Sequence, residues 1–371
     1  MLYRAIGLMS GSSLDGLDIV FVEFQENAGK WQYEIIAAEC EEYAQVWKER
    51  LQNATELNAR DYQLLHVEYG HYLGEAVNRF IDKNSLHYKV GLIASHGHTT
   101  FHMPAKKLTA QLGDGAAIAA KTGLPVVSDL RALDVAFGGQ GAPIVPIGEK
   151  LLFPEFDLYL NLGGIANMSF NLPGKYIAFD VCPANRVLNL ISETTGKSYD
   201  DKGQMAKMGN INESLLEKLN GLSYYLQPYP KSLANDFGVE VIYPMIKSFG
   251  LTHNDALRTY TEHMVQQLTT AIETNFIPNV GQEEAIKSNF RMLVTGGGAL
   301  NDFLIATLSQ KLQTKGVTVM LPEMNVINYK EALVMALIGV LRWRQEYNVL
   351  SSVTGAIRDS IGGAVWIGQE A

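Results

Sequence analysis

Asp180 is a carboxylate whose place in the sequence suggests more than a surface charge. It follows an apolar, strand-like segment, Tyr176–Phe179, and it precedes a helix whose apolar face consists of Val187, Leu188 and Ile191. In open α/β sheets the point where a strand leads into a helix lies at the rim of the ligand crevice. The alternative is that Asp180 only caps the helix, because a carboxylate there satisfies free amides and complements the helix dipole. Position alone leaves both interpretations open.

Two glycine-rich turns, one in each half of the chain, favour a phosphate-binding function. The first joins the strand-like segments 5–9 and 17–24 through Ser10–Gly16, and the second places Gly163 and Gly164 between segments 158–162 and 167–171. Such turns expose consecutive N–H groups that can cradle a phosphate. An ordinary hairpin loop remains the alternative for either turn alone. Beside the first turn, Asp15 and Asp18 offer oxygen ligands that could hold Mg²⁺ through water.

A histidine-rich segment follows the buried-type strand Val90–Ala94. His96, His98 and His102 lie within seven residues of one another, which raises the possibility of a zinc site. The spacing lacks the paired i, i+4 geometry of helical zinc sites. We therefore expect a strand-end loop that faces the crevice and hydrogen-bonds a polar ligand.

Two further glycine-rich segments are candidates for ligand contact. Arg131 and Asp134 come just before the glycine-rich segment 138–143, which is typical of a crossing between domains that also lines a site. Gly296–Gly298 separate a strand (291–295) from a helix (302–312). Consecutive glycines allow a flat ring or a pyrophosphate to approach the backbone closely.

Length and composition restrict the class of protein. A chain of 371 residues is expected to form two domains with a cleft between them. The net charge of −9 offers no basic face for nucleic acid or anionic lipid. Cys40 and Cys182 have neither metal-site nor redox spacing and fit free thiols in a reducing compartment. The N-terminus lacks a signal-like apolar run, and the longest apolar run, Ala332–Leu341, is too short to span a bilayer. We expect a cytoplasmic protein.

The combined motifs resemble the anhydro-N-acetylmuramic acid kinase family of the actin, hexokinase and Hsp70 superfamily. They recur in the family's order over nearly the whole chain: GLMSGSSLDGLD (7–18), SHGHTTFHMP (95–104), DLRALDVAFGGQGAPIVP (129–146), LNLGGIANMS (160–169), FDVCPAN (179–185), YDDKGQMAKMG (199–209), VTGGGALN (294–301), KEA (330–332) and SVTGA (352–356). The resemblance implies a two-lobed, ribonuclease H-like α/β fold. Each lobe is then a mixed sheet flanked by helices, with ATP between the lobes. We place the N-terminal lobe at residues 1–129 plus 346–371 and the C-terminal lobe at 130–345.

The resemblance implies an ATP-dependent kinase of cell-wall recycling and amino-sugar catabolism. Members open 1,6-anhydro-N-acetylmuramic acid with water and phosphorylate its O6, giving N-acetylmuramic acid 6-phosphate and ADP. Asp180 matches the family's base, and Glu331 matches a glutamate that orients substrate or water. A sugar, ATP and Mg²⁺ are the implied ligands, and a homodimer is the implied assembly.

The resemblance also assigns the remaining site residues. The residues expected to bind ATP and its phosphates are Gly11, Ser12, Ser13, Leu14, Asp15, Gly16, Leu17, Asp18, Asn161, Gly163, Gly164, Gly296, Gly297, Gly298 and Asn301. The residues expected to bind the sugar are His96, Gly97, His98, Arg131, Asp134 and Asn185.

The substrate side departs from the family pattern, so two other functions stay open. Cys182–Asn185 reads Cys-Pro-Ala-Asn in place of Gly-Pro-Gly-Asn, Arg131 lacks its usual arginine neighbours, and segment 231–236 has lost an arginine and a glycine. We expect Lys231 to be a solvated lysine. One alternative is a kinase of another anhydrosugar or hexose, and the other is a non-catalytic, chaperone-like ATP-binding module. A Walker A motif and a GxSxG elbow are both absent from the sequence.

Overall fold

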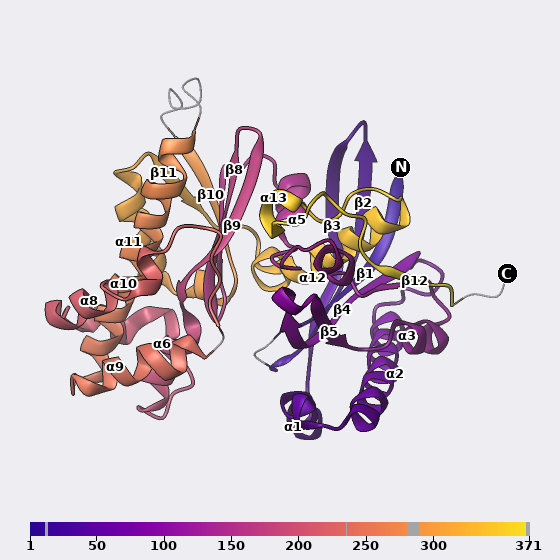
Figure 1. Ribbon diagram of the computed structural model, residues 1–371, viewed down its shortest axis with the longest axis horizontal. Helices are drawn as coiled ribbons and strands as arrows, with labels where there is room; N and C mark the ends of the chain where they lie inside the picture. Colours follow the sequence, from indigo (N-terminus) through magenta and orange to yellow (C-terminus); the bar gives the residue numbers. More distant parts are fainter. Residues whose placement is uncertain (12–13, 235, 281–288, 369–371) are drawn as a thin grey trace. The chain divides into compact units, whose positions relative to one another are not determined.

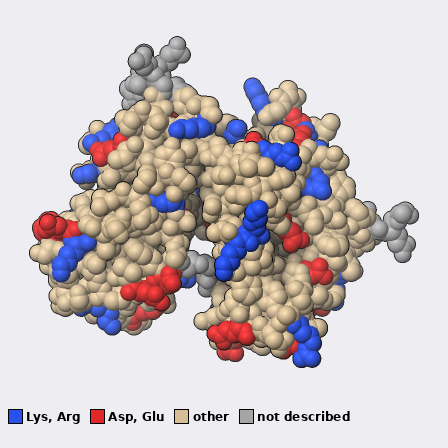
Figure 2. Space-filling model, in the orientation of Figure 1, with Lys and Arg blue, Asp and Glu red and all other residues tan. Residues whose placement is uncertain are grey.

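A computed structural model describes residues 1–11, 14–234, 236–280 and 289–368. The chain divides into two compact units, each described below by itself. The first unit combines residues 1–154 with 329–371, and the second is the continuous segment 155–328 (Figure 1). On the face shown in Figure 2, basic and acidic side chains alternate in small groups among larger neutral areas.

The first unit contains a mixed sheet. Its strands are β1 (Leu2–Ser10), β2 (Gly16–Asn27), β3 (Lys30–Glu42), β4 (Leu92–Met103), β5 (Leu108–Leu112), β6 (Val126–Ser128) and β12 (Ala364–Trp366). The strand order is β12-β6-β4-β1-β2-β3, and β5 pairs with β4. β1 is parallel to β4 and antiparallel to β2. The helices are α1 (Gln45–Gln52), α2 (Ala59–Lys83), α3 (Gly115–Thr122), α4 (Ala132–Ala136), α5 (Pro146–Leu152), α12 (Met324–Trp343) and α13 (Ser351–Thr354).

Helices cover both faces of this sheet because its central strands are apolar on both sides. Ile6 and Leu8 of β1 pack with α2 in one buried cluster. Successive side chains of a strand point to opposite faces, and Gly7 accordingly faces α12. A Cβ at Gly7 would lie 2.0 Å from the carbonyl oxygen of Ala332. The glycine therefore permits the close approach of α12.

α12 carries the residue predicted to orient substrate or water, Glu331. By length and composition it could cross a membrane, but 72% of its most apolar window is buried inside the protein, which is typical of a core helix. The helix is kinked at Tyr329 (φ −122°, ψ 15°). Its first residues, 324–328, belong to the second unit and the rest to the first.

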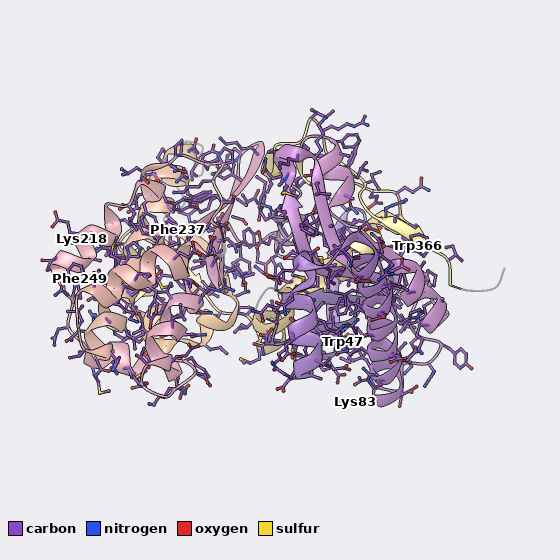
Figure 3. All side chains as sticks on the ribbon, turned by 60° about the horizontal axis from the view of Figure 1, so that its bottom comes forward. Trp47, Lys83, Lys218, Phe237, Phe249 and Trp366 are labelled. Carbon is purple, nitrogen blue, oxygen red and sulfur yellow. The ribbon has the colours of Figure 1, made fainter. Side chains whose placement is uncertain are left out.

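The second unit is a smaller mixed sheet with helices packed against it. Its strands are β7 (Leu158–Leu162), β8 (Ile165–Leu172), β9 (Lys175–Pro183), β10 (Phe290–Thr295) and β11 (Val317–Met320), in the order β11-β10-β7-β8-β9. Its helices are α6 (Asn185–Glu193), α7 (Gln204–Met208), α8 (Glu213–Asn220), α9 (Tyr243–Ser248), α10 (His253–Asn275) and α11 (Asp302–Gln313). Alternate residues of β7 and β10 share a buried cluster with α6, α8, α10 and α11, which Figure 1 shows beside the sheet. In Figure 3, Lys218 of α8 lies next to Phe249, with Nζ 5.0 Å from the ring centroid.

The predicted fold class, mixed sheets flanked by helices in two parts, is confirmed, although three local predictions differ from the structure. The crossing between units lies at Pro154–Glu155 and at Asn328–Tyr329, so residues 130–154 and 329–345 belong to the first unit. The histidine-rich segment is part of β4, because residues 98–103 pair with β5. β9 continues to Pro183, and α6 begins only at Asn185.

Candidate active site

Asp180 lies within β9, close to its carboxyl end, and its carboxylate is half-buried. Oδ2 accepts a hydrogen bond from the backbone N–H of Leu233 at 2.9 Å. Burial raises the pKa of the Asp180 carboxyl above its ordinary value, and the hydrogen bond from Leu233 opposes that rise. A desolvated carboxylate with a raised pKa suits a general base.

The carboxylate of Asp180 does not cap the helix that follows it. The N-cap residue of α6 is Ala184, and no side chain caps this helix among the described residues. Among the described residues, the carboxylate accepts its hydrogen bond from Leu233, 53 residues further along the chain. Of the two interpretations that the sequence left open, helix capping is therefore the one that the geometry disfavours.

Two residues that sequence reasoning did not place at the site lie against Asp180. The hydroxyl of Tyr224 donates to the backbone oxygen of Asp180 at 2.6 Å. The backbone oxygen of Lys231 accepts from the Asp180 N–H at 3.3 Å. The Lys231 Nζ lies 4.7 Å from the centroid of the Tyr224 ring, and burial lowers the pKa of Lys231, opposed by Cys182. Lys231 is thus half-buried beside Asp180 rather than solvated.

The second glycine turn meets the start of α6 and the three-glycine segment. The N–H groups of Ala184 and Asn185 donate to the carbonyls of Gly164 (2.8 Å) and Gly163 (3.1 Å). The Asn185 amide donates to the carbonyl of Leu162 at 2.9 Å.

The three-glycine segment approaches the same turn so closely that a Cβ would not fit at Gly296 or Gly298. A Cβ at Gly296 would lie 2.8 Å from Asn161 Oδ1, and one at Gly298 would lie 2.6 Å from the Cβ of Leu162. A Cβ at Gly297 would meet Asn185 at 3.6 Å. The structure therefore gathers these predicted ATP-binding residues at one end of the second sheet. Asn301 lies at the end of the same segment and caps α11 through Leu304 N–H at 3.0 Å.

In the first unit, carboxylates gather beside the first glycine turn. Gly11, Leu14, Asp15 and Gly16 are described there, and β2 already begins at Gly16, so it includes Leu17 and Asp18. Ser12 and Ser13 lie outside the described residues. Burial raises the pKa of Asp18 to about 6, a hydrogen bond with Cys40 opposes the rise, and the charges of Asp15 and Glu331 add to it. Glu331 is thus electrostatically close to Asp18.

The buried histidines of β4 are neutral and hydrogen-bonded. The Nδ1 of His96 contacts the carbonyl of Gly97 at 2.9 Å, and its Nε2 accepts from the Arg131 Nε at 2.8 Å. A carbonyl only accepts, so the proton of His96 is on Nδ1. Burial lowers the pKa of His96 to about 3, and it lowers the pKa of His98 to about 4. His96 therefore orients Arg131.

Arg131 and Asp134 hold the glycine-rich segment against the first unit. Arg131 donates to the carbonyl of Gly141 at 2.6 Å, and Asp134 accepts from the N–H of Gly141 at 2.7 Å. Asp134 also accepts from the Thr354 hydroxyl at 2.7 Å. Burial lowers the pKa of Arg131 to about 10, and the charges of Glu331 and Asp134 oppose this. The predicted crossing is therefore a folded segment that keeps Arg131 beside Glu331.

Comparison with known proteins decides the family. The family model described as "Anhydro-N-acetylmuramic acid kinase" matches residues 3–368. The chain belongs to this family.

Curated members of the family cover most of the chain. The anhydro-N-acetylmuramic acid kinase of Photobacterium profundum is 34% identical over 322 residues, covering 83% of this chain and 84% of the relative. That of Vibrio parahaemolyticus is 32% identical, covering 95% of each chain. A solved structure of the activator of 2-hydroxyisocaproyl-CoA dehydratase from Clostridium difficile, with bound ADPNP, covers 92% of this chain and 96% of its own at 12% identity and a TM-score of 0.45. Membership confirms the predicted enzyme class, a phosphotransferase acting on an alcohol group.

Proposed function

We propose that this protein uses ATP and water to convert 1,6-anhydro-N-acetylmuramic acid to N-acetylmuramic acid 6-phosphate and ADP. Its membership of the kinase family supports the reaction. The observation that carries the proposal is Asp180, a desolvated carboxylate on β9 held by the Leu233 N–H.

Asp180 acts as the general base in this scheme. Its carboxylate takes a proton from water, and the water oxygen forms the new bond at C1. The C1–O6 bond breaks as O6 takes the γ-phosphoryl group of ATP. The bond between the γ-phosphorus and the oxygen that joins it to ADP also breaks, and its electron pair stays on ADP. Phosphoryl transfer thereby relieves the charge on the departing oxygen. General-base catalysis of this kind contributes about 10² to 10⁴ in rate.

The first unit suits a divalent cation near Asp15 and Asp18. Among the described residues, no three His, Cys, Asp or Glu side chains group closely enough to hold a metal ion directly. Mg²⁺ usually keeps several waters and needs only one or two carboxylates. The negative charges of Asp15 and Glu331 help raise the pKa of Asp18. A bound cation would offset this concentration of negative charge. When bound, Mg²⁺ would spread the charge of the transferred phosphoryl group.

The remaining assignments extend this proposal. The two glycine turns, the Gly296–Gly298 segment and Asn301 bind ATP. Glu331 orients water or sugar, and the sugar contacts are His96, Gly97, His98, Arg131, Asp134 and Asn185. Both cysteines are free thiols, which suits a cytoplasmic protein. The homodimer implied by the resemblance is tested by light scattering during size-exclusion chromatography.

Sugar-dependent ADP release tests the function. Purified protein with ATP and Mg²⁺ should release ADP only when 1,6-anhydro-N-acetylmuramic acid is present, and EDTA should stop the release. Asp180→Asn should lower the rate at least about 100-fold. Asp200→Asn is the matched control. The buried Asp200 carboxylate accepts from the N–H groups of Met205 and Ala206, so its loss should affect stability rather than turnover.

Two results would redirect the proposal. ADP release with another anhydrosugar or a hexose, and none with the proposed sugar, would change the substrate. ATP binding without any sugar-dependent release from a panel of sugars would indicate a non-catalytic module.

A further inference from the structure

A buried chain of hydroxyl groups leads from α2 to the first glycine turn. The hydroxyls of Tyr69 and Tyr43 lie 2.6 Å apart, and Tyr43 donates to the Ser10 Oγ at 2.8 Å. The Ser10 Oγ lies 3.1 Å from the Nδ1 of His98. All four side chains are buried. Ser10 is the last residue of β1, directly before the turn.

The single proton of each tyrosine hydroxyl fixes the direction in which the two tyrosines donate their hydrogen bonds. A hydroxyl has a single proton to donate. Tyr43 gives its proton to Ser10, so Tyr69 donates to Tyr43. The direction of the Ser10–His98 hydrogen bond follows the tautomer of the His98 ring. Burial raises the pKa of both tyrosines and lowers that of His98 to about 4. Both tyrosines therefore stay protonated and His98 stays neutral at neutral pH.

Tyr43 also contacts the other side of the turn. Its backbone N–H donates a long hydrogen bond, 3.4 Å, to the carbonyl of Asp15. Tyr43 directly follows β3, whose last residue, Glu42, pairs with Gly16. One residue thus bonds the residue that enters the turn, Ser10, and a residue that leaves it, Asp15.

The ring of Tyr43 is held by aromatic neighbours. Its centroid lies 6.4 Å from that of Tyr69 and 6.1 Å from that of Tyr72. Trp47, labelled in Figure 3, packs at a tilt against both neighbours, with its ring centroid 5.5 Å from that of Tyr69 and 4.8 Å from that of Tyr72. Packed rings lose little further freedom when they position a hydroxyl, so the cluster acts as a rigid support for the turn.

We propose that Tyr43 is a positioning residue that holds Ser10 and Asp15, one on each side of the first glycine turn, where they support binding of the ATP phosphates. This inference rests on the proposed function, because it needs the turn to bind phosphate. Tyr43 itself touches no reacting atom in this scheme. Its effect should therefore appear in ATP affinity and not in sugar affinity.

Tyr43→Phe tests the inference, because it removes the hydroxyl and keeps the packed ring. We expect kcat/KM for ATP to fall about tenfold, the size expected for one buried hydrogen bond, while the KM for the sugar stays unchanged. Calorimetry with ATP and Mg²⁺ in the absence of sugar should show the same loss of affinity. Tyr69→Phe, one link further away, should give a smaller loss.

Tyr72→Phe is the matched control. Tyr72 belongs to the same aromatic cluster, but its hydroxyl donates to Glu41 at 3.1 Å and not to the turn. It should lower the melting temperature without changing the KM for ATP. Should Tyr43→Phe not fold, Ser10→Ala removes the same link and should raise the KM for ATP.

Three outcomes are decisive. An unchanged KM for ATP in Tyr43→Phe would overturn the inference, and so would equal losses in Tyr43→Phe and Tyr72→Phe. If the unchanged protein neither binds ATP nor releases ADP, the proposed function fails instead.

Discussion

Replacing Lys330 with methionine is expected to destabilise the first unit strongly. Lys330 lies beside the kink of α12, and its Nζ contacts Glu149 Oε1 of α5 at 2.8 Å. Only 2% and 4% of the two side chains are exposed. Removing Lys330 takes the cation of this pair away from a carboxylate that stays buried, and such a loss costs about 3–5 kcal/mol. At about 2–4 °C per kcal/mol for a domain of this size, the melting temperature of the unit should fall by about 6–20 °C.

A double-mutant cycle separates the ion pair from the lost packing. Lys330→Met and Glu149→Met should each be destabilising, and the double variant should recover most of the loss because no charge stays buried. Glu149 has a further interaction. This interaction is lost in both Glu149→Met and the double variant, so its contribution cancels in the coupling energy. Scanning calorimetry measures all four proteins. A melting temperature within about 2 °C of the unchanged protein for Lys330→Met, or a coupling energy near zero, would refute the reasoning.

Three further predictions concern pH and packing. The pKa values of His96, His98 and His263 are lowered from 6.5 to about 3, about 4 and about 3, so below about pH 6.5 the unfolded chain binds protons that the folded chain does not. The free energy of unfolding should fall by about 1.4 kcal/mol per pH unit per histidine between about pH 6.5 and pH 4, and flat urea midpoints over that range would contradict this. Because the pKa of Asp180 is raised above 3.8 and a base must be ionised, sugar-dependent kcat should decline with falling pH at a value above 3.8; an acidic limb only below that value would argue against the role. Gly7→Ala should destabilise by about 3 kcal/mol, since its Cβ would meet the Ala332 carbonyl, whereas Gly29→Ala meets no atom within 4 Å and should cost only the strain of its positive φ; thermal melts of both variants check the difference.

Sequence reasoning located the strands and helices whose apolar residues recur with the period of that element and pack into one core. β1, β2 and α2 follow this rule, because their apolar residues share a single buried cluster. The end of β4 was missed because residues 96–102 are mostly polar, and their strand conformation depends on pairing with β5 rather than on an apolar pattern.

The site was predictable where a motif is local and not where it depends on distant contacts. The second glycine turn and the Gly296–Gly298 segment were each located from adjacent residues, and the structure brings the two together. Lys231 and Tyr224 reach Asp180 only because the segment after α8 returns to β9, which no residue spacing reveals. Segment 138–143 has the composition of a linker, yet Asp134 binds its backbone, and the actual crossing at Pro154–Glu155 has no comparable signal.

The first unit is built from two separate segments of the chain, and this sets the order in which it can fold during synthesis on the ribosome. Residues 155–328 form a continuous unit and can complete their fold while the chain is still being made. β1 and β2 are translated far earlier. Their apolar surface around Gly7, Val20 and Val22 stays exposed to solvent until α12, one of the last helices, is translated and covers it. This face of the sheet is therefore exposed during most of the synthesis of the chain. We expect molecular chaperones to bind the nascent protein there.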